Sequence, residues 1–349
     1  MFSTVKGLVE SNNFTSLPPI YVFPKKPEDS MLSTAETVPI IDFSLLTSAN
    51  DPDQRCKAIQ DLGNACRDWG FFVLINHGVP EELRDEILRA SCSFFELAEE
   101  EKREFAGNQV LDPIRCGSSF NVKVDKSFYW RDYLKLHVHP SFNAPNKPPG
   151  FSEVLQEYSE KTREVADELM KGVSKSLGLE ADYILKRMNV ESGSQLLVIN
   201  LYPPCPQPEI AMGLPPHTDH GLLTLLIQNE LCGLQVQHHG KWIPVNPHPN
   251  SFLVNLGDHM EILTNGEYKS VVHRAMVNKK ATRISIGTAH GPSFETTVSP
   301  APELVSESHP PAFRGIKYSE YLELQQKYQL ETKSCLDRVR ISTSEINNY

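Results

Sequence analysis

The sequence contains no long hydrophobic run. No stretch of about 18 apolar residues occurs, which argues against a membrane-spanning helix. Residues 1–30 are interrupted by Glu10, Asn12 and Pro18, so they hold no apolar segment long enough for a signal peptide. We therefore expect a cytoplasmic protein, with the nucleus as a second, additional location.

Surplus positive charge is also missing. The 349 residues include 34 Lys and Arg against 44 Asp and Glu, and the net charge is −10. Proteins that bind nucleic acid or an anionic membrane surface need an excess of basic residues. The composition argues against both partners and favours a small-molecule substrate, and we expect the protein to be a monomer.

Cysteine patterns for disulfides or zinc are absent as well. The seven cysteines are odd in number and widely spread, and none forms a Cys-x-x-Cys pair. This usage is typical of reduced thiols in a reducing compartment.

The chain is predicted to divide into four regions. Residues 1–37 are polar and contain prolines, which suggests an extended arm. Residues 38–194 read as a mixed helical region, with strands expected at 38–43 and 70–75 and helices at 54–69, 81–97 and 151–177. Within it, residues 108–146 show no regular period and suit a lid or a substrate-facing segment. Residues 331–349 are expected to form a tail that is mobile beyond Arg340.

Residues 195–330 have a different sequence pattern, and we expect them to form the central domain of the fold. Turn residues such as Gly240, Pro247 and Gly257 separate short apolar runs at 196–202, 222–228, 234–237, 242–245, 252–256, 271–277 and 284–289. This pattern predicts an antiparallel sandwich or barrel, closed by a helix at 318–329. The fold class is therefore mainly β with flanking helices.

Three residues in the core have the spacing of a metal site. His217 and Asp219 form a His-x-Asp pair, and His273 follows at a distance. Two imidazoles and one carboxylate suit Fe(II) and leave three octahedral positions open. Hydrolytic zinc, which also takes three protein ligands and a water, is the competing metal. A His-x-Asp pair alone is a weak signal, because such short motifs often arise by chance.

A possible anion site follows the metal residues. Arg283 offers a planar fork for a carboxylate, and Ser285 lies two residues on, which places it on the same side of a strand. Asn200 and Tyr202 alternate in the same way on another strand, and each could bind an oxoacid. Taken singly, Arg283 reads as an exposed ion-pairing residue, and the other two read as core or cap residues.

Together these residues indicate a resemblance to a known enzyme family. Over about residues 38–330 the chain resembles the plant 2-oxoglutarate and Fe(II)-dependent dioxygenases, which include flavonoid, gibberellin and alkaloid oxygenases. The likeness is carried by Pro39-Ile40-Ile41-Asp42, Trp69-Gly70-Phe71-Phe72, Asn200-Leu201-Tyr202-Pro203, His217-Thr218-Asp219, Asn255-Leu256-Gly257-Asp258, His273-Arg274 and Arg283-Ile284-Ser285, in the order of that family. Ser119-Phe120-Asn121-Val122 and the segment 130–134 look like the branch with salicylate hydroxylases and some flavone synthases.

The resemblance implies a fold, cofactors and a reaction. The fold is a double-stranded β-helix, or jelly roll, in which His217, Asp219 and His273 hold Fe(II). Arg283 and Ser285 bind 2-oxoglutarate, assisted by Tyr202 and Asn200. Dioxygen is consumed, ascorbate supports activity, and succinate and carbon dioxide are released as a substrate is hydroxylated, desaturated or demethylated.

The substrate is expected to be a small specialised metabolite of phenolic or flavonoid type. A terpenoid or alkaloid is the alternative, as are a non-catalytic metabolite-binding protein on the same fold and an ethylene-forming oxidase that does not consume 2-oxoglutarate. Phe120, Tyr133 and Phe294 are candidates to line the pocket, although large aromatics also build ordinary cores.

Three positions depart from the family pattern. Leu201 stands where many members have a second Tyr, and His220 stands where Pro often follows the Asp. Val198 replaces a Lys of some flavonoid enzymes, which argues against an anthocyanidin-type synthase.

Overall fold

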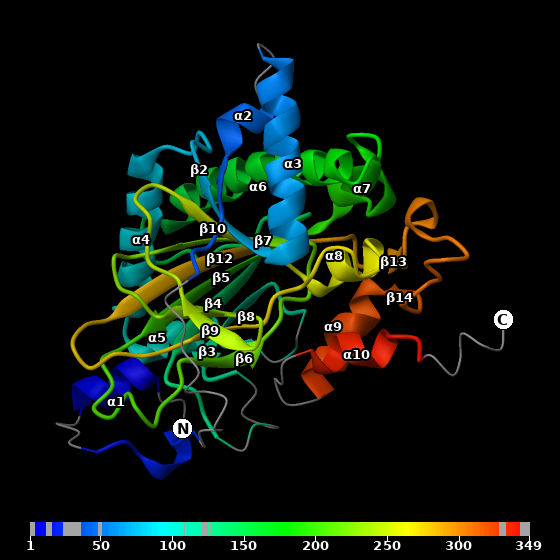
Figure 1. Cartoon of the computed structure of the whole chain (residues 1–349). Helices are drawn as coiled ribbons and strands as arrows, with labels where there is room; N and C mark the ends of the chain where they lie inside the picture. Colours follow the sequence, from blue (N-terminus) through cyan, green and yellow to red (C-terminus); the bar gives the residue numbers. More distant parts are fainter. Residues whose placement is uncertain are drawn as a thin grey trace.

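The computed structural model describes residues 4–11, 16–23, 36–47, 51–107, 109, 111–120, 125, 127–327 and 333–342. Two β-sheets face each other, and helices cover the outer face of the larger one (Figure 1). The jelly-roll core predicted from the sequence is confirmed. Among the described residues, no helix has both the length and the apolar character needed to cross a membrane.

The larger sheet has eight strands in the order β1-β2-β10-β7-β12-β5-β4-β3. Their bounds are β1 Ile40–Asp42, β2 Phe71–Ile75, β3 Ile114–Ser118, β4 Asp132–His139, β5 Ser194–Tyr202, β7 Leu223–Gln228, β10 Phe252–Leu256 and β12 Arg283–Gly291. All neighbours pair antiparallel except β1 and β2. Strands from both the N-terminal region and the core therefore share one sheet.

The smaller sheet has the order β6-β11-β8-β9. Its strands are β6 Leu214–His217, β8 Leu234–His238, β9 Lys241–Pro244 and β11 His273–Ala275. A two-stranded ribbon of β13 Thr297–Val298 and β14 Ile316–Lys317 lies apart from both sheets.

The helices were largely expected. Those described are α1 Val5–Ser11, α2 Phe43–Thr47, α3 Pro52–Asp68, α4 Glu81–Phe95, α5 Glu99–Arg103, α6 Phe151–Ser176, α7 Tyr183–Arg187, α8 Asp258–Leu263, α9 Tyr318–Lys327 and α10 Ser334–Val339, with short 3-10 turns at Pro19–Tyr21, Val190–Ser192 and Pro302–Leu304. The Asp51 side chain caps α3 by accepting hydrogen bonds from the backbone of Asp53 and Gln54. The predicted helices 54–69, 81–97 and 151–177 correspond to α3, α4 and α6.

The main hydrophobic core lies between the helices and the outer face of the larger sheet. Alternate residues of β4, β5 and β12 enter it, among them Leu134, Leu197 and Ile286. They meet the apolar face of α6, which includes Leu155 and Leu169. Because side chains alternate along a strand, the remaining residues of these strands face the smaller sheet instead.

Several local predictions need correction. The segment 108–146 contains β3 and β4, which extend the larger sheet rather than form an irregular lid. The run 271–277 is a strand only over His273–Ala275, and β6 was not predicted because Pro215 and Pro216 occupy its middle. The region expected to be a tail includes α10, whose Leu336 belongs to the core. The last two residues of the helix predicted at 318–329 lie outside the described residues. So does most of the segment expected to be mobile beyond Arg340, namely residues 343–349.

Candidate functional site

A pocket opens between the two sheets, and its floor is a regular grid on the larger sheet. Cross-strand partners share a face, so the register places side chains in rows. One row joins Lys135, Val198, Gly287 and Leu226 across β4, β5, β12 and β7. The next joins His137, Leu196, Ala289 and Thr224, and another contains Tyr133, Asn200 and Ser285. Most of these residues line the pocket, and Gly287 and Ala289 leave room at its centre.

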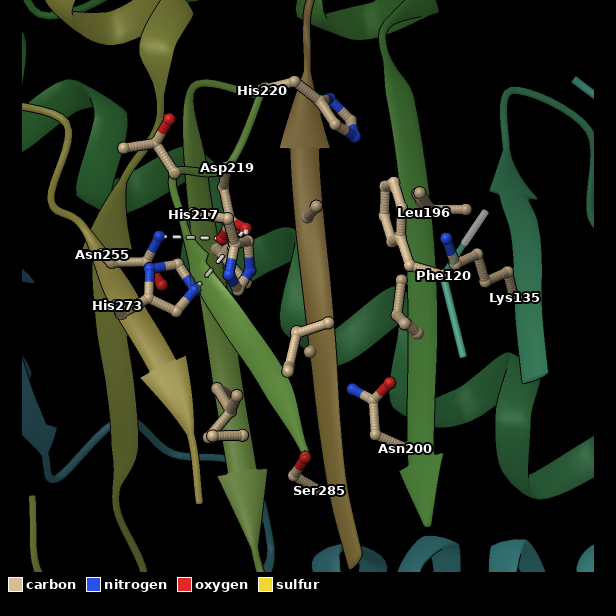
Figure 2. A pocket seen from close by; sticks show the side chains of 18 of the residues that line it. Phe120, Lys135, Leu196, Asn200, His217, Asp219, His220, Asn255, His273 and Ser285 are labelled. Atoms are coloured by element: carbon tan, nitrogen blue, oxygen red, sulfur yellow. Dashed lines mark hydrogen bonds and ion pairs between the residues drawn. The ribbon is translucent and has the colours of Figure 1, made fainter. Parts of the chain in front are cut away.

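The predicted metal residues meet at one end of this pocket (Figure 2). His217 is the last residue of β6, Asp219 lies in the following turn, and His273 on β11 pairs directly with His217. Asp219 Oδ1 is 3.8 Å from His217 Nε2 and 3.7 Å from His273 Nε2. All three ligand atoms lie within 4.8 Å of one another, which suits a single metal ion.

Hydrogen bonds orient each of the three side chains. The Nδ1 atoms of His217 and His273 face the backbone carbonyls of Pro215 and Val271 at 2.8 and 3.2 Å. A ring that donates from Nδ1 keeps its Nε2 lone pair free for a metal. Two side chains also hold Asp219 in place.

Two hydrogen bonds hold the carboxylate of Asp219 on the side away from the imidazoles. Thr224 Oγ1 and Asn255 Nδ2 donate to its Oδ2 at 2.6 and 2.8 Å, which leaves Oδ1 facing the imidazoles. Burial by itself raises the pKa of Asp219, but the two imidazoles and these hydrogen bonds outweigh it and lower that pKa. Burial, and then the neighbouring His273, lower the pKa of His217 to about 3. A carboxylate and a neutral imidazole are the forms that bind a divalent metal.

The predicted anion residues gather beside the metal cluster. Arg283 is buried, and its Nη2 donates to Gln228 Oε1 at 2.5 Å. Its Nε and Nη1 make no hydrogen bond within the described structure, and its guanidinium lies 5.0 Å from the Tyr202 ring. A buried guanidinium with free donors fits a carboxylate. Ser285 lies next along the same face of β12.

Arg131, which was not among the predicted site residues, orients Asn200. Arg131 Nη1 donates to Asn200 Oδ1 at 2.8 Å, and Arg131 Nε donates to the Ser119 carbonyl. With its oxygen engaged, the Asn200 amide presents its NH2 group for another partner. Asn200 faces the pocket from β5 in Figure 2.

The three candidate substrate residues take different places. Phe120 and Phe294 line the pocket. Tyr133 is not one of the described residues that line the pocket. The centre of its ring lies 5.0 Å from Lys135 Nζ and 5.3 Å from the guanidinium carbon of Arg131.

Other pocket residues were missed. Lys135 and His137 alternate with buried Leu134 and Leu136 on β4, and that alternation was the signal that could have revealed them. His220, whose role was left open, also lines the pocket, and its Nδ1 lies 2.9 Å from the hydroxyl of Tyr318. Leu201, the departure from the family pattern, packs in the main core on the opposite face of β5.

Comparison with known proteins decides the family. Residues 193–292 match the 2OG-Fe(II) oxygenase superfamily, and residues 38–157 match the N-terminal region described for the non-haem dioxygenase in morphine synthesis. The chain is 45% identical to 2-oxoglutarate-dependent dioxygenase 19 of Oryza sativa subsp. japonica over 314 residues, which is 90% of this chain and 93% of that protein. The chain belongs to the 2OG-Fe(II) oxygenase family.

Two further relatives are consistent with this. Flavonol synthase/flavanone 3-hydroxylase of Petunia hybrida is 38% identical over 292 residues, or 82% of each chain. The crystal structure of JOX2 in complex with 2OG, Fe and JA matches with a TM-score of 0.88 and 33% identity, covering 98% of both chains.

Family membership settles several predictions. This 2OG-Fe(II) oxygenase is a dioxygenase that uses Fe(II) and 2-oxoglutarate, as predicted, and it acts on a small molecule. Hydrolytic zinc and a non-catalytic role are therefore set aside. The donor set agrees with this assignment, because two imidazoles and one carboxylate are the ligands of non-haem iron oxygenases.

Proposed function

We propose that His217, Asp219 and His273 hold the catalytic iron. The observation that carries this proposal is the convergence of two Nε2 atoms and one carboxylate oxygen, each freed for a metal by hydrogen bonds on its other side. With its co-substrate and dioxygen, the bound iron supplies the oxidising chemistry that releases succinate and carbon dioxide. The protein's own residues orient the reactants and limit the access of water.

The 2-oxoglutarate site is assigned to the residues beside the iron ligands. The free donors of Arg283 bind the remote carboxylate of 2-oxoglutarate, and Ser285 on the same strand supports it. Tyr202 and the NH2 group of Asn200 complete the site, and Arg131 holds Asn200 in position. Gln228 fixes the guanidinium of Arg283 from the side.

The substrate proposed is a phenolic or flavonoid-like specialised metabolite. Phe120 and Phe294 offer aromatic surfaces to the pocket, and its apolar floor of Val198, Gly287 and Leu226 fits a planar ring system. The similarity to an enzyme named flavonol synthase/flavanone 3-hydroxylase supports this choice. Hydroxylation is the proposed reaction, and desaturation or demethylation would need only another substrate pose.

A turnover assay tests the function. Purified protein with Fe(II), 2-oxoglutarate and ascorbate is incubated with phenolics, flavonoids, terpenoids and alkaloids, while succinate and product mass are followed. Phenolic or flavonoid compounds should stimulate succinate release and gain 16 Da. Stimulation by terpenoids or alkaloids alone would replace the substrate class, and no succinate release with any compound would refute the oxygenase activity of this chain.

The monomeric state and the cytoplasmic location also stand as proposals. They follow from the same composition, namely a net charge of −10 and no cysteine pattern for disulfides. Light scattering during size-exclusion chromatography would test the first, and a dimeric mass would refute it. Cell fractionation would test the second.

A further inference from the structure

The pocket wall opposite the metal cluster carries two cations, Lys135 and Arg115, that make no ion pair with the described residues. Lys135 on β4 lines the pocket, and its Nζ makes no hydrogen bond or ion pair with the described residues. Instead, the ammonium lies 4.9 Å from the centre of the Phe120 ring and 5.0 Å from that of Tyr133. Figure 2 shows Lys135 beside Phe120 at the opposite side of the pocket from the two metal histidines.

A second cation reinforces this wall. Arg115 on β3 pairs with Lys135 across the strands, and it also lines the pocket. Its Nε is buried without a hydrogen bond, and no carboxylate lies within ion-pair distance of its guanidinium in the described structure. Arg131, the residue directly before β4, has a further buried nitrogen, Nη2, that makes no hydrogen bond within the described structure.

Such an arrangement is unfavourable in the free protein. Lys135 and Arg115 are half-buried, and a cation partly removed from water loses part of its hydration, which contact with aromatic rings only partly replaces. Burial, and then the charges of Arg115 and Arg131, lower the pKa of Lys135 well below its ordinary value. Burial likewise lowers the pKa of Arg115. Unfavourable groups of this kind that face a pocket are typical of ligand-binding sites.

The position of Lys135 separates it from the 2-oxoglutarate residues. Arg283 pairs with Tyr202, whereas Lys135 pairs with Val198, four residues earlier on the same strand. The strand of Lys135, β4, lies three strands away from β7, whose Thr224 donates a hydrogen bond to Asp219. At about 4.8 Å per strand, β4 and β7 are about 14 Å apart. The floor between them consists of Val198, Gly287 and Leu226, which offer no polar side-chain group.

We infer that the substrate is an amphipathic acid, whose carboxylate binds between Lys135 and Arg115 while its apolar body crosses the floor toward the metal. This inference rests on the proposed function, since it takes the pocket beside the metal cluster as the substrate site. It adds a chemical requirement that the phenolic class alone does not contain. The aromatic rings of Phe120 and Tyr133 then flank the ammonium and shield its contact with the acid from water.

Matched acid and ester pairs test the inference by binding alone. Full-length protein loaded with Fe(II) and 2-oxoglutarate under argon is titrated calorimetrically with benzoate, cinnamate and 2-naphthoate, and with the methyl ester of each. At least one acid should bind about tenfold more tightly than its ester, which is the effect of one charge-assisted hydrogen bond. If no acid binds more tightly than its ester, the inference is wrong.

Variants at Lys135 locate the effect. Lys135→Met keeps the length of the side chain but removes its charge, and it should abolish the preference for acid over ester. Lys135→Arg keeps the charge and should retain the preference, which excludes a simple packing defect. A preference that persists in Lys135→Met would overturn the inference, as would a loss of 2-oxoglutarate affinity equal to the loss of acid affinity.

The two proposals fail in different ways. Absence of succinate release under every condition would refute the oxygenase activity of this chain, yet the binding preference would still be measurable without turnover. Equal binding of acids and esters by an active enzyme would refute the carboxylate site and leave the oxygenase intact.

Discussion

The two ends of the pocket contrast in how completely their polar groups are paired. At the metal end, Asp219 receives two hydrogen bonds, and His217 and His273 each face a backbone carbonyl. At the β3–β4 end, the Lys135 ammonium contacts two aromatic rings but makes no hydrogen bond or ion pair, and the Nε of Arg115 makes no hydrogen bond, within the part of the chain that the structure describes. The first end is oriented in advance by the protein, whereas the second is completed only when a ligand arrives.

The contrast reflects what each end must bind. A metal ion has the same size and charge in every turnover, so its ligands gain from being fixed in advance. A substrate site determines selectivity through charges that only one class of ligand satisfies. Variants at the metal end should therefore affect turnover of every substrate, and variants at the far end should change which substrate is used.

The largest effect is expected from loss of a metal ligand. Asp219→Ala removes the single carboxylate of the cluster and should abolish succinate formation with any substrate. The fold should persist, because Asp219 lies in a turn outside the hydrophobic core. Succinate assays together with thermal melting check both points, and His217→Ala should behave in the same way. Full activity in both variants would remove the iron assignment.

A large but more selective effect is expected at Arg283. Arg283→Met should raise the KM for 2-oxoglutarate, because a buried charge-assisted contact is worth about 2 kcal/mol or more, or about 30-fold. Iron content, measured in parallel, should stay at the level of the unmodified protein. An unchanged KM for 2-oxoglutarate would place the carboxylate clamp elsewhere in the pocket.

An intermediate effect is expected at Thr224, which holds the carboxylate of Asp219 in place. Thr224→Val removes one of the two hydrogen bonds that hold Asp219 Oδ2 and should lower Fe(II) affinity by about 10- to 100-fold. Thr288→Val is the matched control, since Thr288 pairs with Leu225 and Leu197 on the opposite face of the sheet. Titration of the metal-free proteins with Fe(II) measures the difference. Equal affinity in the two variants would show that Asp219 needs no support from Thr224.

The smallest effect is expected at Asn200. Asn200→Ala removes the amide that Arg131 orients toward the pocket, and it should cost about 1 kcal/mol of 2-oxoglutarate binding, or about fivefold in KM. The Fe(II) affinity is the internal reference for this variant. A KM equal to that of the unmodified protein would leave Asn200 with a structural role only.

Much of the fold could be predicted because its signals are local. Helices α3, α4 and α6 have continuous apolar periods, and most core strands are apolar runs between turn residues. β6 escaped prediction because two of its four residues are prolines, which weaken any strand signal. β3 and β4 escaped because charged and aromatic residues obscured the alternation of Leu134, Leu136 and Val138.

Apart from His273, the candidate site was predictable where residues near one another in the sequence act together. His217 with Asp219, and Arg283 with Ser285, are two residues apart, so one strand or turn presents each pair. Thr224 and Asn255 come from other strands and Arg131 directly precedes β4. Nothing in their local sequence indicates what they contact. Their roles depend on strand register, which long-range pairing determines.

The sequence by itself determined the family and its jelly-roll core, because the order and spacing of the motifs are written along the chain. It also predicted the metal residues His217, Asp219 and His273 and the 2-oxoglutarate clamp at Arg283, which stay predictions. Only the tertiary structure decided that the polar face of β4 looks into the pocket. By alternation alone, Lys135 and His137 would read as an ordinary solvent-facing edge. The smaller sheet covers that face and turns exposed charges into an enclosed binding surface. Alternation identifies the two faces of a strand, but what lies opposite each face depends on segments distant in the sequence.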